Sequence, residues 1–509
     1  MSTSNNKRLV KNTIALYIRT FVVLIISLYL SRLLLKELGV DDYGIYNVVG
    51  SVVVLFTFLN IAMTQAVQRF TTYELGKGDM VELNRVFSMS VITQLIGIFL
   101  IIIFAETIGL WFLKTQLNIP PARMNAAQFA YHLTILTFCF SMLKVPYEAM
   151  IISYEKMKVY AYLGIIDAVL KLSVIIIISF LDFDKLKMYT LGLAFETFVI
   201  FFIYKIYCSK KIEGCKFKAF WDWPLCKKIL QFSGWSLFGG ITNVATQNGF
   251  IFILNIFYGV AVNASMGLAN QVSSAVSSFV GSFQTSFRPQ IVKSHAQDDN
   301  EHVLTLVSKT SKISFLLVFV PALLLIINMP LVLKTWLTDV PDYTVEFCRL
   351  IIISLIIDAT TGPYNIAIMA TGKIRNYQIA LSFSFATDLI FSYIMIKMGV
   401  MPQYILYSRI ATRGILNMFI GWYFLIRQLS FDLKLYLRHV ILPIVFAVIL
   451  IIPIPIFLLY IIDEWRLFIW STLSIFIIGA VISYYVVLDK RERVLLKVLI
   501  YKKNISNGV

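Results

Sequence analysis

The sequence has few charged residues for its length. Only 14% of its 509 residues are Asp, Glu, Lys or Arg, whereas 59% are hydrophobic, and the mean hydropathy is +0.79. A soluble globular protein carries about 25% charged and roughly 45–50% apolar residues. The composition therefore indicates an integral membrane protein. At ~20 apolar residues per spanning helix, about fourteen helices leave no room for a sizeable soluble domain, which disfavours nucleotide-driven pumps and membrane-tethered enzymes.

Signatures of catalysis and metal binding are missing as well. The chain has no P-loop, no H-E-x-x-H and no G-x-S-x-G motif. Its four histidines are scattered, and its five cysteines lack the paired spacing of a zinc site, so free thiols are expected. We therefore expect no catalytic residue, no bound metal and no cofactor.

Long apolar segments recur along the whole chain, and about fourteen of them can be placed. They lie near 12–35, 43–67, 86–112, 127–149, 160–181, 187–206, 233–258, 263–287, 311–335, 345–370, 376–397, 403–426, 439–461 and 466–487. An even number of crossings puts both tails on one side. About thirty Lys and Arg residues lie on that side against about eight on the other. Both termini are thus predicted to be cytoplasmic, and the net charge of +17 mostly reflects this bias.

A weak internal repeat divides the chain into halves. The stretch 44–56 matches 267–279 in its Gly, Asn, Val, Ser, Val and Phe, and each stretch opens the second segment of its half. The fold predicted is all-α and polytopic, with two six-helix lobes and two additional C-terminal helices. The expected parts are the N-terminal lobe 1–206, a basic linker 207–232 with an interfacial helix on the anionic inner leaflet, the C-terminal lobe 233–427, and the last two helices with a basic tail, 428–509.

Several charged residues fall inside the apolar segments, where a charge is costly unless it meets water or a partner. Those close enough to segment ends to be interfacial are Arg32, Glu106, Lys144, Glu148 and Arg349. Those predicted to face a hydrated interior are Arg19, Asp167, Lys171, Asp358, Arg409 and Arg413. The remaining segment acids are Glu196 and Asp388.

Two spacings sharpen this prediction. Asp167 and Lys171 are four residues apart, so they share a helix face and can either neutralise each other or open to bind a charged ligand. Arg409 and Arg413 have the same spacing but like charge, so they repel unless something compensates them. This favours an anionic ligand, with pairing to acids on neighbouring helices as the alternative.

Neutral polar side chains gather in the seventh and eighth segments, whose many small residues suit either a cavity or close helix packing. Together with Asn47 of the second segment, they are candidates to meet a hydroxyl-rich cargo. These residues are Asn243, Gln247, Asn270 and Gln271.

Over essentially its whole length, the chain resembles the polysaccharide-transporter branch of the multidrug/oligosaccharidyl-lipid/polysaccharide exporter superfamily, the Wzx-type O-antigen and capsule flippases. The resemblance rests on landmarks that are topological and not catalytic. These are Asn12-Thr13 with Arg19, the run 38–46 (LGVDDYGIY), Arg69-Phe70 with Gly76-Lys77-Gly78-Asp79, and the run 370–375 (ATGKIR).

The resemblance implies two six-helix lobes around a V-shaped cavity that opens alternately to each side. It also implies a cargo, an undecaprenyl-pyrophosphate-linked oligosaccharide moved from the inner to the outer leaflet of the bacterial cytoplasmic membrane. Arg19 occupies the place where related flippases meet the pyrophosphate, and Arg32, Lys171, Arg409 and Arg413 match less specifically. Coupling to Na+ or H+ is expected at the family level, with Asp167, Asp358 and Asp388 as candidates.

The expected partners are the lipid-linked oligosaccharide, membrane lipids, and a polysaccharide polymerase with its chain-length machinery, but no nucleic acid. Three alternatives stay open. A lipid II flippase handles similar chemistry, and a drug/cation antiporter of the same superfamily needs an acidic cavity. A membrane glycosyltransferase or polymerase needs larger outer loops than this chain provides.

Overall fold

The structure is a computed structural model that describes residues 3–54, 57–115, 119–337 and 340–453, with a few isolated positions further on. Within these residues every regular element is a helix, and nine helices are long and apolar enough to cross a membrane. The chain forms two compact units. The first is Asn12–Ile241, and the second is Thr242–Val509 together with Met1–Lys11. The prediction of an all-α polytopic membrane protein with two lobes is confirmed.

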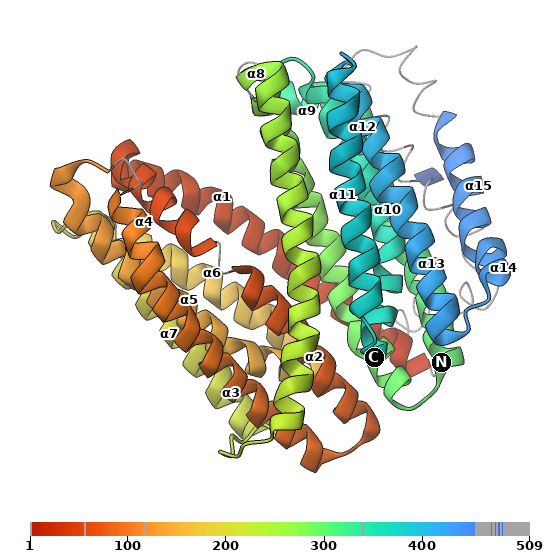
Figure 1. Cartoon of the computed structure of the whole chain (residues 1–509), viewed down its shortest axis with the longest axis horizontal. Helices are drawn as coiled ribbons and strands as arrows, with labels where there is room; N and C mark the ends of the chain where they lie inside the picture. The colour runs from red at the N-terminus through yellow and green to blue at the C-terminus, as the bar shows by residue number, and fades with distance from the viewer. Residues whose placement is uncertain are drawn as a thin grey trace, which may run out of the picture. The chain divides into compact units, whose positions relative to one another are not determined.

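The first unit contains the helices of the first six predicted segments and the start of the seventh (Figure 1). They are α1 (Thr3–Val54), α2 (Thr57–Lys77), α3 (Met80–Phe104), α4 (Leu110–Thr115), α5 (Met124–Ser153), α6 (Met157–Ser179), α7 (Lys185–Lys211) and the beginning of α8 (Trp223–Ala296). A π-helical turn, Ala105–Gly109, joins α3 to α4. Helix α5 is central, because it packs on α7, α2, α3 and α6.

The second unit holds the rest of α8 and the helices that follow it. They are α9 (Asn300–Trp336), α10 (Thr344–Thr371), α11 (Arg375–Lys397), α12 (Pro402–Arg409), α13 (Leu416–Leu429), α14 (Leu433–Tyr436) and α15 (Leu442–Ile451). π-Helical turns, Ile410–Ile415 and Leu437–Ile441, join α12 to α13 and α14 to α15. Helix α10 packs on both α9 and α13. The predicted segment 466–487 lies outside the continuously described residues.

Both units contain one sharply bent helix at a glycine. Helix α1 bends at Gly39 (φ 73°, ψ 173°) and α8 bends at Gly259 (φ 82°, ψ −175°). This backbone conformation is essentially restricted to glycine. In each unit the bend separates the first spanning segment from the second, shortly before the repeated stretch that begins at Gly44 or Gly267. The weak sequence repeat therefore has a counterpart in the backbone.

In the connection between α7 and α8, the helical residues within 207–232 belong to the end of α7 and the start of α8. Helix α7 continues to Lys211, residues 212–222 are not helical, and α8 starts at Trp223. The reason lies in local capping: the Asp222 carboxylate accepts a hydrogen bond from the Leu225 backbone N–H at 3.1 Å, and Pro224 favours the first helical turn. The aromatic residues there therefore begin a long helix.

Candidate functional site

A stripe of polar and small residues runs along one face of α6 in the first unit. Tyr160, Gly164, Asp167 and Lys171 are spaced by four, three and four residues, which places them above one another on a helix. Side chains from α1, α5 and α7 meet this stripe. This face of α6 is the candidate site of the first unit.

Arg19 of α1 lies against the α6 stripe. Its guanidinium carbon is 4.7 Å from the centroid of the Tyr160 ring, a cation–π contact. A Cβ atom at position 164 would lie 2.2 Å from the Arg19 Nε, so the absence of a side chain at Gly164 makes room for the guanidinium. In the described part of the chain, this buried Nε has no hydrogen-bond partner. The site therefore holds a positive group with unused donor capacity.

The other end of the stripe carries two acids and one base. The Lys171 ammonium is 3.0 Å from an Asp167 carboxylate oxygen. Glu196 of α7, only 3% exposed, interacts electrostatically with both residues and accepts a hydrogen bond from the Thr197 hydroxyl at 3.0 Å. Lys171 thus interacts with two carboxylates, and the Lys144 ammonium also acts on Asp167. Because an uncompensated buried charge is costly, this group is suited to taking up one further cation or a proton.

Tyr204 of α7 connects the two ends of this network. The buried Tyr204 hydroxyl interacts electrostatically with Arg19, Asp167 and Glu148, and the Lys144 ammonium lies 5.4 Å from the centroid of its ring. Lys144 and Glu148 are themselves 3.8 Å apart and both are largely buried. The two residues interpreted as interfacial are therefore part of the same interior network as Arg19.

The second unit contains a separate buried ion pair. The Arg409 Nε is 3.0 Å from an Asp388 carboxylate oxygen, with the two side chains 11% and 1% exposed. The Thr412 hydroxyl donates to the other Asp388 oxygen at 3.0 Å, and the Arg409 guanidinium lies 3.9 Å from the centroid of the Phe250 ring. Of the two interpretations left open for Arg409, the structure therefore shows pairing with an acid on a neighbouring helix.

The remaining predicted site residues with described side chains lie on α1, α8 and α10. Arg32 on α1, Asp358 on α10, and Gln247 and Gln271 on α8 are exposed, whereas Asn243 and Asn270 on α8 are partly buried. The side chains of Asn47 and Arg413 lie outside the described part of the structure. The structure thus brings together Arg19, Asp167 and Lys171 in one unit, and Asp388 and Arg409 in the other.

Two residues of the first site have no role in the sequence-based prediction. Gly164 has no signal in the sequence beyond its place one turn after Tyr160. In the sequence, Glu196 stands out only as an acid near the middle of the segment 187–206. Its electrostatic interaction with Asp167 joins two helices, which the sequence does not reveal.

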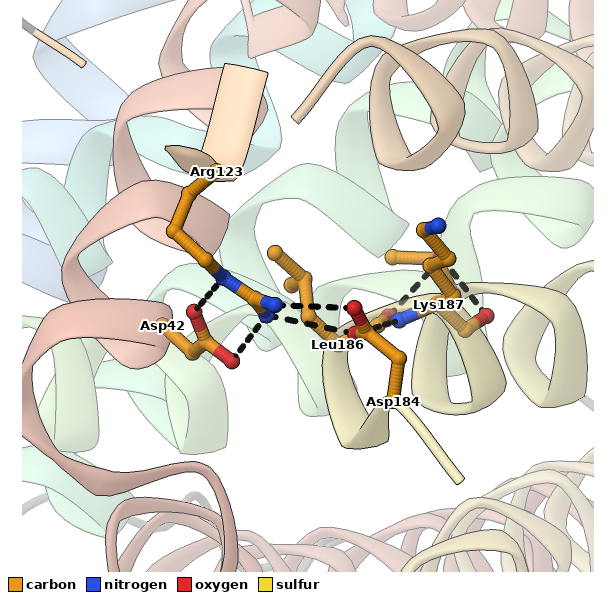
Figure 2. A network of polar contacts seen from close by, with 6 residues as sticks. Asp42, Arg123, Asp184, Leu186 and Lys187 are labelled. Atoms are coloured by element: carbon orange, nitrogen blue, oxygen red, sulfur yellow. Dashed lines mark hydrogen bonds and ion pairs between the residues drawn. The ribbon is translucent and has the colours of Figure 1, made fainter. Parts of the chain in front are cut away.

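Figure 2 shows an ion-pair network in which Arg123 lies between Asp42, just after the bend of α1, and Asp184. The Arg123 guanidinium donates to Asp42 and Asp184, with Nε to Asp42 and Nη1 to Asp184 both at 2.8 Å. On the other side of Gly39, Glu37 accepts from the Lys185 ammonium at 2.9 Å. The bend is therefore tied on both sides to the residues that begin α7.

Replacing Arg123 with alanine should destabilise the protein at neutral pH but not in acid. Partial burial raises the pKa of Asp184, but hydrogen bonds from the Arg123 guanidinium and the Lys187 backbone N–H outweigh it and bring the pKa below its ordinary value. A carboxylate with a lowered pKa stabilises the fold above its unfolded pKa of about 4, and this contribution disappears as the pH falls through the folded value. We expect a loss of about 1–2 kcal/mol at pH 7 for these partly exposed pairs.

The measurement is denaturant unfolding of the purified protein across pH, with Lys114→Ala as the control that removes an exposed cation. The difference between parent and Arg123→Ala should shrink as the pH drops below about 4. A difference that stays constant with pH would show that Arg123 acts through packing and not through its charge.

Comparison with known proteins identifies the fold. No protein-family model matches the sequence, and no curated protein is similar to it in sequence. Solved structures do match, among them a MATE in complex with MaD3S (TM-score 0.72, 12% identity, 83% of this chain and 95% of that chain). Another is an outward-facing multidrug resistance MATE family transporter of the MOP superfamily (TM-score 0.70, 13% identity, 82% and 94%).

A third match is a MOP superfamily transporter from Pyrococcus furiosus Vc1, described as having a binding pocket of reversed polarity that suggests a different function (TM-score 0.72, 11% identity, 83% and 96%). At these identities the likeness establishes the fold. That fold is shared with known membrane transporters. The polysaccharide branch and the cargo are not distinguished by it.

Proposed function

We propose that this protein is an exporter that moves an undecaprenyl-pyrophosphate-linked oligosaccharide across the bacterial cytoplasmic membrane by alternating access. The observation that carries the proposal is Arg19, whose buried Nε has no hydrogen-bond partner among the described residues. A pyrophosphate group cannot enter a hydrocarbon environment without cations, and guanidinium groups bind phosphates with strong, directional hydrogen bonds. Arg19 would meet the pyrophosphate while the lipid chain stays in the bilayer.

The mechanism needs no covalent chemistry. Arg19 would bind the head group when the cavity faces the cytoplasm, and movement of one lobe against the other would expose it outward. Asn243 and Asn270, both partly buried on α8, are proposed to meet the sugars. The termini would be cytoplasmic, and a polymerase with its chain-length machinery would use the exported units.

The acidic group on α6 and α7 is proposed to couple transport to an ion gradient. Asp167 and Glu196 share the Lys171 ammonium, so a proton or Na+ would complete their charge balance. Asp388 is a weaker candidate than Asp167, because Arg409 and Thr412 already satisfy its carboxylate. Asp358 is exposed on α10, so a charge there is less costly than at the buried Glu196.

Export of cationic drugs is the second candidate function, and the same acidic group favours it. Two carboxylates beside Lys171 could receive an organic cation in place of a coupling ion. One of the similar folds belongs to a protein described as a multidrug resistance transporter. A lipid II flippase would use Arg19 in the same way, differing only in the sugars.

Deleting the gene distinguishes these functions. For the proposed exporter, surface glycan should be lost while completed lipid-linked units accumulate facing the cytoplasm. Accumulation of incomplete units would indicate a biosynthetic enzyme instead. Unchanged glycan with altered drug tolerance would indicate the antiporter, and accumulation of lipid II would indicate the peptidoglycan precursor as cargo.

A further inference from the structure

The connection between α7 and α8 is expected to lie at a membrane surface, because it joins helices long and apolar enough to span a bilayer. It joins the end of one candidate spanning helix, Lys185–Lys211, to the start of another, Trp223–Gly259. It also lies on the first turns of a third, Met80–Thr115, because Asn84 and Ser88 of that helix bind its backbone. Three candidate spans therefore end at this connection.

Hydrogen bonds hold the connection to the first unit along most of its length. The Lys156 ammonium and the Tyr154 hydroxyl donate to the carbonyl groups of Lys211 and Glu213, at 2.8 and 3.0 Å. The Asn84 amide donates to the carbonyl groups of Gly214 and Lys216, at 2.9 and 2.7 Å.

The end of the connection is held in the same way. The Lys218 N–H donates to the Ser88 hydroxyl at 3.1 Å, and Arg85 pairs with Asp222 at 2.7 Å. A segment fixed at this many points presents its outward side chains in one arrangement.

The fixed connection nevertheless exposes large aromatic rings. Trp221 and Trp223 are 58% and 57% exposed, and their rings stack with centroids 6.2 Å apart and an angle of 23° between their planes. Phe217 nearby is 47% exposed. Tryptophan side chains at the ends of spanning helices characteristically sit at the level of the lipid head groups.

Exposed lysines lie on both sides of the two tryptophans. Lys216, Lys218, Lys227 and Lys228 are exposed, as is the acid Glu213, whereas Asp222 pairs with Arg85, which also pairs with Glu82. We define the linker patch as Lys216, Lys218, Trp221, Trp223, Lys227 and Lys228. The patch thus combines a stacked indole pair with net positive charge.

We propose that the linker patch is a binding site for an anionic phospholipid of the leaflet in which it lies. The lysine ammonium groups would contact the lipid phosphate, and the stacked indoles would lie along the glycerol and upper acyl chain. Charge complementarity favours this occupant, because lysines near an anionic bilayer surface each contribute about 1 kcal/mol. An acidic soluble partner would match the lysines, but it would leave the indoles without an apolar counterpart.

The test uses the full-length protein in nanodiscs of phosphatidylcholine in which phosphatidylglycerol replaces an increasing share of the lipid. Native mass spectrometry then measures the ratio of the two lipids that stay bound. The parent should retain phosphatidylglycerol in excess of its share of the bilayer. A variant with Lys216, Lys218, Lys227 and Lys228 all changed to Gln should lose this preference by roughly tenfold or more.

The matched control changes the same number of exposed lysines elsewhere, at Lys36, Lys114, Lys373 and Lys397, and it should keep the preference. Trp221→Ala with Trp223→Ala should reduce the retention of both lipids. Equal retention by the patch variant and the control would overturn the proposal, as would competition by free glycerol phosphate. Because the readout is lipid binding, its outcome is independent of the cargo that the protein transports.

Discussion

Replacing Gly164 with alanine should reduce transport nearly as much as removing Arg19 itself. The added Cβ would lie 2.2 Å from the Arg19 Nε, so the guanidinium must shift from its position against Tyr160. Charge-assisted hydrogen bonds contribute about 1.5–3 kcal/mol, so loss of the head-group contact should slow glycan export by roughly tenfold to a hundredfold. The measurement is the rate of export per correctly inserted molecule for Gly164→Ala, Arg19→Ala and the double variant.

The double variant should be no slower than Arg19→Ala, because both changes act on one interaction. Gly192→Ala is the matched control, since its Cβ would lie 2.4 Å from a Val174 methyl carbon and touch no charged group. It should cost about 1–3 kcal/mol of stability through overpacking while leaving export per folded molecule unchanged. Normal export by Gly164→Ala would contradict the role given to Arg19.

The largest loss of stability is expected from Asp388→Ala in the second unit. This change leaves the Arg409 guanidinium, 11% exposed, with its contact to the Phe250 ring but without its carboxylate. Removing one partner of a buried ion pair typically costs about 3–5 kcal/mol, whereas replacing both partners with apolar residues of similar size is close to neutral. Asp388→Leu combined with Arg409→Met should therefore recover most of the stability that Asp388→Ala loses.

Denaturant unfolding in detergent measures the stability lost by Asp388→Ala and the stability recovered by the double variant. An Asp388→Ala protein within about 1 kcal/mol of the parent would mean that the ion pair contributes little to the fold. Export by the double variant addresses the role of Asp388 directly. If the pair is structural, export and its dependence on an ion gradient should survive, whereas loss of gradient dependence in a stable protein would make Asp388 a coupling residue.

The positions of the helices along the chain could be predicted from the sequence, because long apolar runs indicate them. Every predicted segment up to 403–426 corresponds to a helix among the described residues. The pairing of Asp167 with Lys171 could also be predicted, because residues four positions apart are neighbours on one face of a helix. The sharp bends at Gly39 and Gly259 could not, since a glycine inside an apolar run gives no indication of its backbone angles.

The side-chain contacts between different helices could not be predicted from the sequence. The Arg123 network joins residues that are 81 and 61 positions apart, and Glu196 meets Asp167 across two helices. Arg409 could be identified as a buried cation, but its partner could not, because several segment acids were available. Within 207–232 the helical residues are the end of α7 and the start of α8, which begins at Trp223 after the Asp222 cap.

The most direct test of the central claim is reconstitution of the purified protein in liposomes with a short-chain polyprenyl-pyrophosphate oligosaccharide that carries a fluorescent sugar. A membrane-impermeant quencher reports how much of the labelled glycan crosses to the other leaflet, with and without a proton or Na+ gradient. A fluorescent organic cation serves as the competing cargo. The proposed function predicts that the parent moves the glycan, that Arg19→Ala moves it at least roughly tenfold more slowly, and that the cation is not transported. Transport of the cation without movement of the glycan would contradict it.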